Sequence, residues 1–239
     1  MRRSLRRTLF DAWRALRTLT TALCLAAAGW IQAAPALPDL DAVVSYETRQ
    51  ITAAGVLRTE VWKERLVRRG DVVWTERVLP AETHAAHAHE SSTEHAGHKH
   101  FDFESAARLL RLDAKGQLQL QYVDREHRVV VSVPKAEYGV VGFDGRWDAA
   151  AHVVPPSVVA RMPVTMNSGA AVWHEEKAPG WSHRVLWSEA RQVALRVESQ
   201  RSDGSFRRVV SVEPVAPTGG LPWKDLATFT QKEYDDFMD

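Results

Sequence analysis

Short strand-like segments separated by turn residues run through most of the chain, and they limit its fold more than any other feature. In QLQLQYV, at 117–123, leucine and tyrosine alternate with glutamine. A period of two is typical of a β-strand with one packed face and one wet face. Upstream, three segments broken by Gly55 and Gly70 predict an antiparallel meander. These three segments are 43–52, 56–69 and 71–80.

The second half of the chain continues this pattern. Asp203-Gly204 is a typical hairpin turn between the last two of its segments. Strands do not alternate with helices along the sequence, so parallel βαβ units are not expected. The expected strands in this half are 127–134, 137–147, 170–176, 182–188, 192–200 and 205–215.

Two segments space their apolar residues as a helix does. We expect a short amphipathic helix from about Asp102 to Leu112 and a terminal helix within 224–239. The proline pair in 151–163 predicts a short helix or an irregular crossing. With eight to ten strands, the predicted fold is mainly β with a few helices (α+β), an antiparallel curved sheet or half-barrel packed on short helices.

The N-terminus has the features of an export signal. The densest apolar part, Leu19 to Ile31, has 13 residues, whereas a spanning helix needs about 20. Small residues follow it at Ala33, Ala34 and Ala36. These features predict a cleavable signal peptide over residues 1–34, with an uncleaved anchor in the inner membrane as the alternative. The basic residues that precede the apolar part are Arg2, Arg3, Arg6, Arg7, Arg14 and Arg17.

Removal of that segment changes the charge of the chain. The first 34 residues hold six arginines and one aspartate, so the remainder has 25 basic and 29 acidic residues and a net charge of −4. Nucleic-acid binding is therefore not expected. Cys24, the only cysteine, is removed too, so the single domain at 35–239 has no disulfide and no thiolate ligand. We expect a periplasmic protein of a Gram-negative bacterium.

Six of the ten histidines lie in HAAHAHESSTEHAGHKH, at 84–100, where the spacing H-x2-H-x-H occurs twice. Imidazole is a favoured ligand for Zn, Cu and Ni. The small and polar residues around the histidines predict a flexible insertion at 80–100 rather than a rigid catalytic centre. This segment is either a metal-binding loop or a solvated insertion with incidental metal affinity. The predicted metal ligands are His84, His87, His89, His95, His98 and His100.

Other histidines and the tryptophans are weaker candidates. His174, Glu175 and Glu176 could form a second metal site with His183 if their strands pair, although a lone histidine in a strand is more often structural. Seven tryptophans lie beyond residue 34. Several could line an apolar cleft for a hydrophobic ligand, but packing within a rolled sheet is the simpler interpretation.

Catalytic motifs are nearly absent from the sequence. It has no G-x-S-x-G, no H-E-x-x-H and no P-loop. The one S-x-x-K string, Ser132 to Lys135, contains Pro134 and closes a predicted strand, so its two side chains are not expected to stack on a helix. No nucleophile–base pair is indicated, and we predict no catalytic residue.

The stretch HRVLWSEARQVALRVESQRSDGSFRRVVSVEPV, at 183–215, has a distinctive order. A strand ends in tryptophan, a turn bears an acidic residue, a strand carries ALRVE, and a DG turn leads into a long strand. This order resembles the periplasmic lipoprotein carriers (LolA-like and LppX-like) and the N-terminal domain of RseB-like stress regulators. Residues 46–78 are similar to the opening meander of that family. The resemblance implies an antiparallel half-barrel around helices, with a concave apolar face that receives acyl chains.

The favoured hypothesis is a non-enzymatic binding or carrier protein for a hydrophobic ligand or a partner segment, with the histidine-rich loop binding a divalent transition metal. The alternative is an envelope-stress regulatory protein of the RseB type, and a metal-dependent enzyme ranks last. The expected partners are a hydrophobic ligand or lipoprotein, or a membrane protein, and no nucleic acid. The N-terminal segment is expected to engage the membrane only for export.

Overall fold

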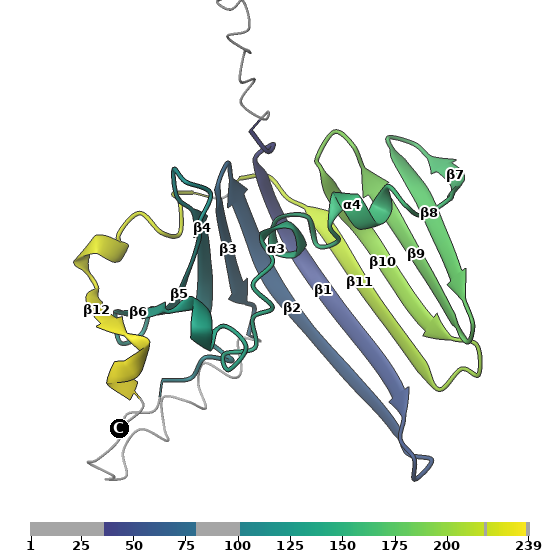
Figure 1. Cartoon of the computed structure of the whole chain (residues 1–239), viewed down its shortest axis with the longest axis horizontal. Coiled ribbons are helices and arrows are strands. Elements are labelled where there is room, and N and C mark those ends of the chain that lie inside the picture. Colours follow the sequence, from purple (N-terminus) through teal and green to yellow (C-terminus); the bar gives the residue numbers. More distant parts are fainter. Residues whose placement is uncertain (1–35, 80–100, 218, 238–239) are drawn as a thin grey trace, which may run out of the picture. The chain divides into compact units, whose positions relative to one another are not determined.

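The protein is described by a computed structural model that covers residues 36–79, 101–217 and 219–237. Its main feature is one open, curved sheet of twelve strands (Figure 1). The predicted signal peptide and the histidine-rich segment lie outside the described residues. The strands of the first half are β1 Leu40–Ile51, β2 Leu57–Arg69, β3 Val72–Arg77, β4 Ala107–Leu112, β5 Leu118–Asp124 and β6 Val129–Val133. Those of the second half are β7 Val164–Ser168, β8 Ala171–Ala178, β9 Trp181–Ser188, β10 Val193–Arg201, β11 Phe206–Pro214 and β12 Thr230–Glu233.

The order of strands shows two meanders joined in the middle of the sheet. Strands β1 to β6 lie in sequence order, as do β7 to β11, and each pairs antiparallel with the next. The antiparallel pair β1–β11 joins them, with Tyr46 opposite Val210. Strand β12 pairs with β6 in parallel. The prediction of a mainly β chain built on a curved antiparallel sheet is confirmed, with this one parallel pair added.

The segment between β6 and β7 crosses the concave face of the sheet. It forms the 3₁₀ turn η1 Lys135–Glu137 and the helices α3 Trp147–His152 and α4 Pro156–Val159. Figure 1 shows both helices in front of the sheet. Pro156 occupies the first helical position of α4, where its missing N–H costs nothing. The predicted short helix or irregular crossing at 151–163 is therefore confirmed.

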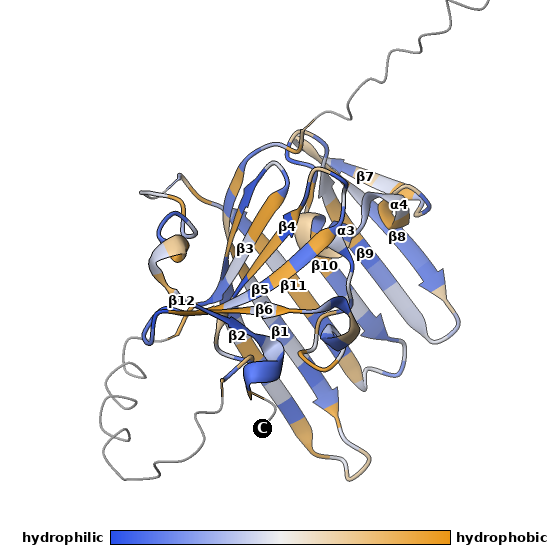
Figure 2. Cartoon of the chain, turned by 60° about the vertical axis from the view of Figure 1, so that its left-hand side comes forward, coloured by the Kyte–Doolittle hydropathy of each residue, from blue (hydrophilic) through white to orange (hydrophobic). Residues whose placement is uncertain are grey.

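In the half of the sheet that contains β3–β6, side chains are buried on both faces, and β2 joins this packing only at residues 66–68. Leu110 and Tyr122 belong to the cluster on the concave face with Phe143, whereas Leu109 and Trp74 belong to a second cluster on the convex face. Figure 2 shows the apolar residues of this half along its strands. Burial on both faces lets a strand carry consecutive apolar residues instead of an alternating pattern.

The predicted helix from Asp102 to Leu112 is wrong. The Asp102 carboxylate accepts hydrogen bonds from the backbone N–H groups of Glu104 and Ser105, which makes a turn, and strand β4 follows. Because β4 lies between β3 and β5, Leu109 and Leu110 are buried on opposite faces. A short apolar run of this kind is ambiguous between helix and strand, and the neighbouring strands decide it.

The predicted terminal helix is also wrong. The segment forms 3₁₀ turns η2 Leu226–Thr228 and η3 Tyr234–Phe237 on either side of β12. Phe229 packs in the cluster on the convex face and Tyr234 in the cluster on the concave face. The chain passes around the β6 edge of the sheet here. Its apolar residues therefore pack against both faces of the sheet, whereas those of an amphipathic helix would pack against one.

The expected strand at 137–147 is replaced by turns. Gly142 and Gly145 both have φ of 73°, which is accessible to glycine but strained for other residues. The Tyr138 hydroxyl donates a hydrogen bond to the carbonyl of Leu118, at 2.9 Å. This contact holds the turns against the sheet, and the segment leads into α3.

Candidate functional site

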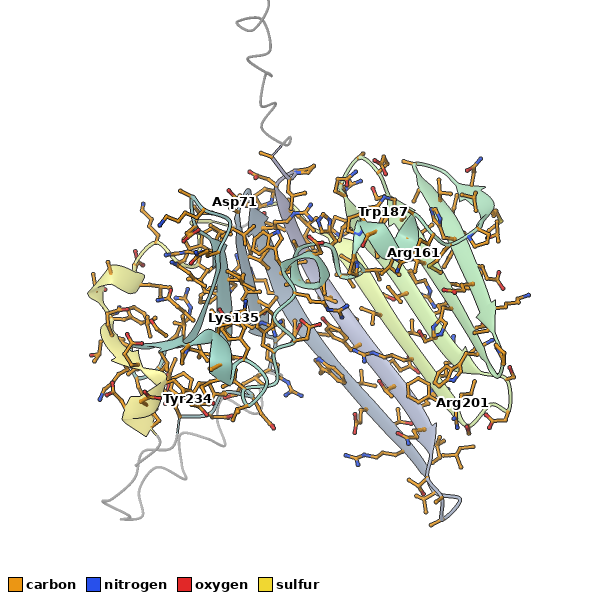
Figure 3. All side chains as sticks on the ribbon, in the orientation of Figure 1. Asp71, Lys135, Arg161, Trp187, Arg201 and Tyr234 are labelled. Carbon is orange, nitrogen blue, oxygen red and sulfur yellow. The ribbon has the colours of Figure 1, made fainter. Side chains whose placement is uncertain are left out.

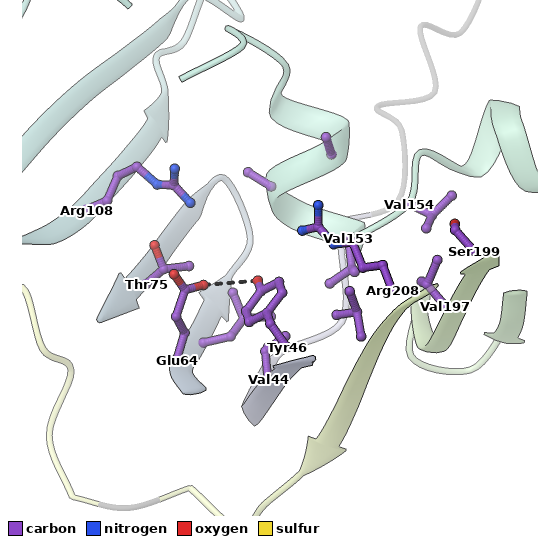
Figure 4. Close-up of a pocket in the computed structure, with 14 residues that line it drawn as sticks. Val44, Tyr46, Glu64, Thr75, Arg108, Val153, Val154, Val197, Ser199 and Arg208 are labelled. Carbon is purple, nitrogen blue, oxygen red and sulfur yellow. Dashed lines mark hydrogen bonds between the residues drawn. The ribbon is translucent and has the colours of Figure 1, made fainter. Parts of the chain in front are cut away.

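A cavity of about 360 Å³ lies between the concave face of the sheet and the segment that contains α3 (Figure 4). Eight of its 14 lining residues are aliphatic. The sheet contributes Val44, Leu66, Val197 and Val210, and the crossing segment contributes Ala149, Ala150, Val153 and Val154. The other lining residues are Tyr46, Glu64, Thr75, Arg108, Ser199 and Arg208. A smaller hollow of about 140 Å³ shares Glu64, Thr75 and Arg108 with it.

The sheet residues that line this cavity come from six strands, and strand register brings those of β1, β2, β10 and β11 together. Val44 lies opposite Glu64 of β2, and Tyr46, two residues on, lies opposite Val210 of β11. Side chains two apart in a strand share a face, so β1, β2 and β11 present their cavity residues on the same side. Val210 in turn lies opposite Val197 of β10.

Arg68 holds α3 in place above the cavity through hydrogen bonds. Its side chain is completely buried, and it donates hydrogen bonds to the carbonyls of Ala151, at 2.5 Å, and Gln192, at 3.1 Å. Further bonds reach the carbonyls of Pro38 and Arg191. Burial lowers the pKa of Arg68 to about 10, so it stays charged at neutral pH. One guanidinium thus ties the end of α3 and the β9–β10 turn to β2.

His152, the last residue of α3, makes a second hydrogen bond to the β9–β10 turn. Its Nδ1 lies 2.6 Å from the carbonyl of Gln192, which can only accept, so Nδ1 carries the proton. The side chain is buried, and burial lowers the pKa of the imidazole. The positive charge of Arg68 lowers it further. His152 is therefore a structural histidine of the cavity roof.

A polar pair lies at the centre of the cavity floor. The Tyr46 hydroxyl donates a hydrogen bond to Glu64 Oε2, at 3.0 Å. The Tyr46 ring stacks on Trp62, with centroids 4.8 Å apart and an angle of 11° between the rings. Burial, and then the charge of Glu64, raise the pKa of Tyr46. The phenol is therefore neutral near pH 7 and acts as a donor to the carboxylate.

The two arginines of the cavity lie on opposite sides of Tyr46 in Figure 4. Arg108 comes from β4 and Arg208 from β11. The Nε of Arg108 is buried and has no hydrogen-bond partner within the described part of the chain. Buried donors are almost always paired, so this one is a feature that needs an explanation.

The alternative of a second metal site at His174 and His183 is not supported within the described residues. The strands do pair, and Glu176 lies opposite His183. However, His174 Nδ1 lies 3.1 Å from the carbonyl of Met162, and His183 Nδ1 lies 3.0 Å from Ser199 Oγ. Across 36–79, 101–217 and 219–237, no three His, Cys, Asp or Glu side chains are grouped to hold a metal ion. The six predicted metal ligands of the histidine-rich segment lie outside these ranges.

Of the seven tryptophans in the described residues, none lines this cavity, and Trp181 lines a separate hollow between β8 and β10. Two of the seven are core residues. Trp74 is completely buried in the cluster on the convex face, and Trp187 packs with Val185 beneath α4. Figure 3 places Trp187 at the α4 end of the sheet and Arg201 at the other end of β10.

Sequence reasoning did not identify Tyr46, Glu64, Arg108 or Arg208 as site residues. Alternation along β1 and β2 could have placed Tyr46 and Glu64 on the face of Val44 and Leu66. Arg108 could not be placed, because its segment was assigned to a helix.

No helix within the described residues is long and apolar enough to cross a membrane.

No known protein family matches the sequence, and no curated protein matches it. Several solved structures are similar to the chain at low identity. An uncharacterized conserved protein from Thermus thermophilus is 10% identical with a TM-score of 0.36, and the match covers 80% of this chain and 90% of that one. A domain named for outer membrane lipoprotein sorting, from Vibrio parahaemolyticus, is 11% identical with a TM-score of 0.30, covering 79% and 89%.

A LolA superfamily protein from Nitrosomonas europaea is 9% identical with a TM-score of 0.31, and the match covers 80% of this chain and 91% of that one. The solved structures similar to the chain thus include a LolA superfamily protein and a domain named for lipoprotein sorting.

Proposed function

We propose that the chain is a non-enzymatic binding or carrier protein, and that a hydrophobic ligand or an apolar segment of a lipoprotein occupies the cavity beneath α3. The observation that carries this proposal is the lining of the cavity. Its volume of about 360 Å³ lies within the range of about 300–1,000 Å³ that ligand pockets span. Eight aliphatic side chains provide apolar surface on its floor and roof.

The test is binding of a neutral apolar dye, Nile red, to the purified chain. Ala149 projects from α3 into the cavity lining, so the variant Ala149→Trp fills the cavity from its roof. Ala160, at the end of α4, is exposed and does not line the cavity, so Ala160→Trp is a matched control. We expect Ala149→Trp to abolish the dye fluorescence and Ala160→Trp to leave it unchanged. Equal binding by both variants would refute the assignment of the site.

Cellular ligands can be sought by the same comparison. The wild-type chain and the Ala149→Trp variant are purified from their expression host without detergent, and organic extracts of both are analysed by mass spectrometry. A lipid that is present with the wild type and absent with the variant supports a carrier. Extracts that are identical from the two proteins count against it.

The histidine-rich segment is proposed to bind a divalent transition metal. Six imidazoles in 17 residues supply enough ligands for Zn, Cu or Ni without a folded site. Replacement of His84, His87, His89, His95, His98 and His100 by alanine should abolish Ni²⁺ and Zn²⁺ binding in calorimetry. The double variant His127→Ala/His183→Ala removes two histidines elsewhere and should retain it. Unchanged binding by the six-fold variant would refute this proposal.

Export is proposed on the basis of the N-terminal segment alone. Sequencing of the N-terminus of protein recovered from a periplasmic extract should find it near residue 35. An intact N-terminus in the membrane fraction would support the uncleaved anchor instead. Cross-linking in cells also separates the carrier from the RseB-type regulator, because only the regulator requires a specific membrane-protein partner.

A further inference from the structure

The cavity carries more positive than negative charge. Its charged side chains are Arg108, Arg208 and one carboxylate, Glu64. The Glu64 carboxylate already accepts a hydrogen bond from Tyr46, and it forms no ion pair within 4.0 Å of either arginine. Arg108 is half-buried and Arg208 is exposed, so water screens the charge of Arg208 more, and the attraction for anions is stronger at Arg108.

Arg108 packs against neutral groups, and the nearby carboxylate of Asp144 also interacts with its charge, which lowers the pKa of Asp144. Its guanidinium lies 5.6 Å from the centre of the Phe143 ring and interacts with the hydroxyl of Tyr122. Burial raises the pKa of Tyr122, so this hydroxyl does not supply a negative charge at neutral pH. The buried Nε has no hydrogen-bond partner in the described residues. Arg108 therefore retains an unused donor, and within the described residues it forms no ion pair shorter than 4.0 Å.

Arg208 lies on the other side of Tyr46 from Arg108, over the Tyr46 ring and 5.9 Å from its centre. Within the described residues no carboxylate forms an ion pair with it, in contrast to arginines on the opposite face of the neighbouring strands. There, Arg196 lies 2.6 Å from Glu198, and Arg184 lies 3.4 Å from the same residue. Arg184 and Arg196 thus have an acidic partner, whereas within the described residues neither cavity arginine forms an ion pair shorter than 4.0 Å.

We propose that the ligand is an anionic amphiphile, with an acyl chain against the aliphatic lining and a carboxylate or phosphate head group bound by Arg108 and Arg208. This inference rests on the proposed function and specifies its ligand. Guanidinium groups form strong charge-assisted hydrogen bonds with carboxylates and phosphates. The bound head group would also give the Arg108 Nε an acceptor.

The test is displacement of Nile red at pH 7 by four single-chain amphiphiles with equal tails, below their micellar concentrations. Dodecanoate and dodecyl phosphate are anionic, dodecanol is neutral and dodecylamine is cationic. We expect both anions to bind roughly 10- to 100-fold more tightly than dodecanol, which corresponds to one or two charge-assisted hydrogen bonds. Dodecylamine should bind more weakly than dodecanol. The stronger of the two anions identifies the head group as a carboxylate or a phosphate.

Three variants locate the effect. Arg108→Gln and Arg208→Gln should each reduce the ratio of anion affinity to dodecanol affinity. A circular dichroism spectrum that matches the wild type shows that each variant is folded. Arg207 is exposed on the opposite face of the same strand, so Arg207→Gln is a matched control that should keep the full preference. A preference that survives in both cavity variants, or that falls equally in the control, overturns the proposal.

The outcomes separate this inference from the proposed function. If dodecanol binds as tightly as dodecanoate, the apolar site stands and the anionic head group is wrong. If Nile red and all four amphiphiles fail to bind, the proposed function fails as well.

Discussion

Removal of the Arg68 side chain should loosen the roof of the cavity and destabilise the whole domain. The proposed change is Arg68→Met, which keeps much of the volume and removes the guanidinium. Four backbone carbonyls lose their donor, and one of them, Ala151, is at the end of α3. The Arg68 side chain is completely buried, so in the variant water does not readily reach the four carbonyls to replace its hydrogen bonds.

The magnitude is set by two opposing terms. Hydrogen bonds to a charged donor contribute about 1.5 kcal/mol each at the lower end, so four of them contribute about 6 kcal/mol. Burial of the charge opposes this, because it lowers the pKa of Arg68 from 12.5 to about 10, and that shift corresponds to roughly 3 kcal/mol. The net loss of unfolding free energy should therefore be about 3 kcal/mol, a large part of the stability of a typical domain.

The assay is equilibrium unfolding in urea, followed by tryptophan fluorescence. With a slope of about 2–3 kcal/mol/M, a loss of 3 kcal/mol lowers the midpoint by about 1–1.5 M. Hydrogen exchange should also accelerate at α3, because its last turn loses its tie to β2. The exposed Arg207 provides the control variant Arg207→Met, which should change the unfolding free energy by less than about 0.5 kcal/mol. The reasoning is wrong if Arg68→Met unfolds at the same urea concentration as this control.

Three further predictions concern pH and backbone strain. Burial lowers the pKa of His152 in the folded state. The contribution of neutral His152 to the unfolding free energy should therefore be complete above the unfolded-state pKa of about 6.5, and it should be lost as the pH falls through the folded-state pKa. In urea titrations at several pH values, His152→Gln should lose less unfolding free energy at acid pH than the wild type. Burial and the charge of Glu64 raise the pKa of Tyr46 in the folded state. The unfolding free energy that depends on the neutral phenol should therefore be complete below pH 10 and should fall as the pH rises above it. The unfolding free energy of Tyr46→Phe should fall less steeply with alkaline pH than that of the wild type, and an equal fall would contradict this. Val153 has φ of 67° and ψ of −42°, a conformation that costs a β-branched residue about 1–3 kcal/mol. Val153→Gly should therefore lower the thermal unfolding midpoint less than Val154→Gly does. The reverse order would show that the backbone of Val153 is not strained.

The sequence by itself determined the class of the fold and most of its strands. Alternation along 117–123 and the turns at Gly55, Gly70 and Asp203-Gly204 correspond to β5 and to the β1–β2, β2–β3 and β10–β11 connections. These signals are local, because a period of two and a positive φ depend on residues that are neighbours in the chain. The predicted metal ligands and the signal peptide also come from the sequence alone and remain predictions.

Only the tertiary structure decided which segments have two buried faces and which residues meet in the cavity. Leu109 and Leu110 form a strand because β3 and β5 flank them and both sides of the sheet are covered. Arg108 faces Tyr46 and Arg208 across the cavity because β1 pairs with β11, about 160 residues away in the sequence, and α3 crosses above them. Local patterns assign a side chain to one face of a strand, but the order of the strands and the covering of each face depend on pairing between distant segments.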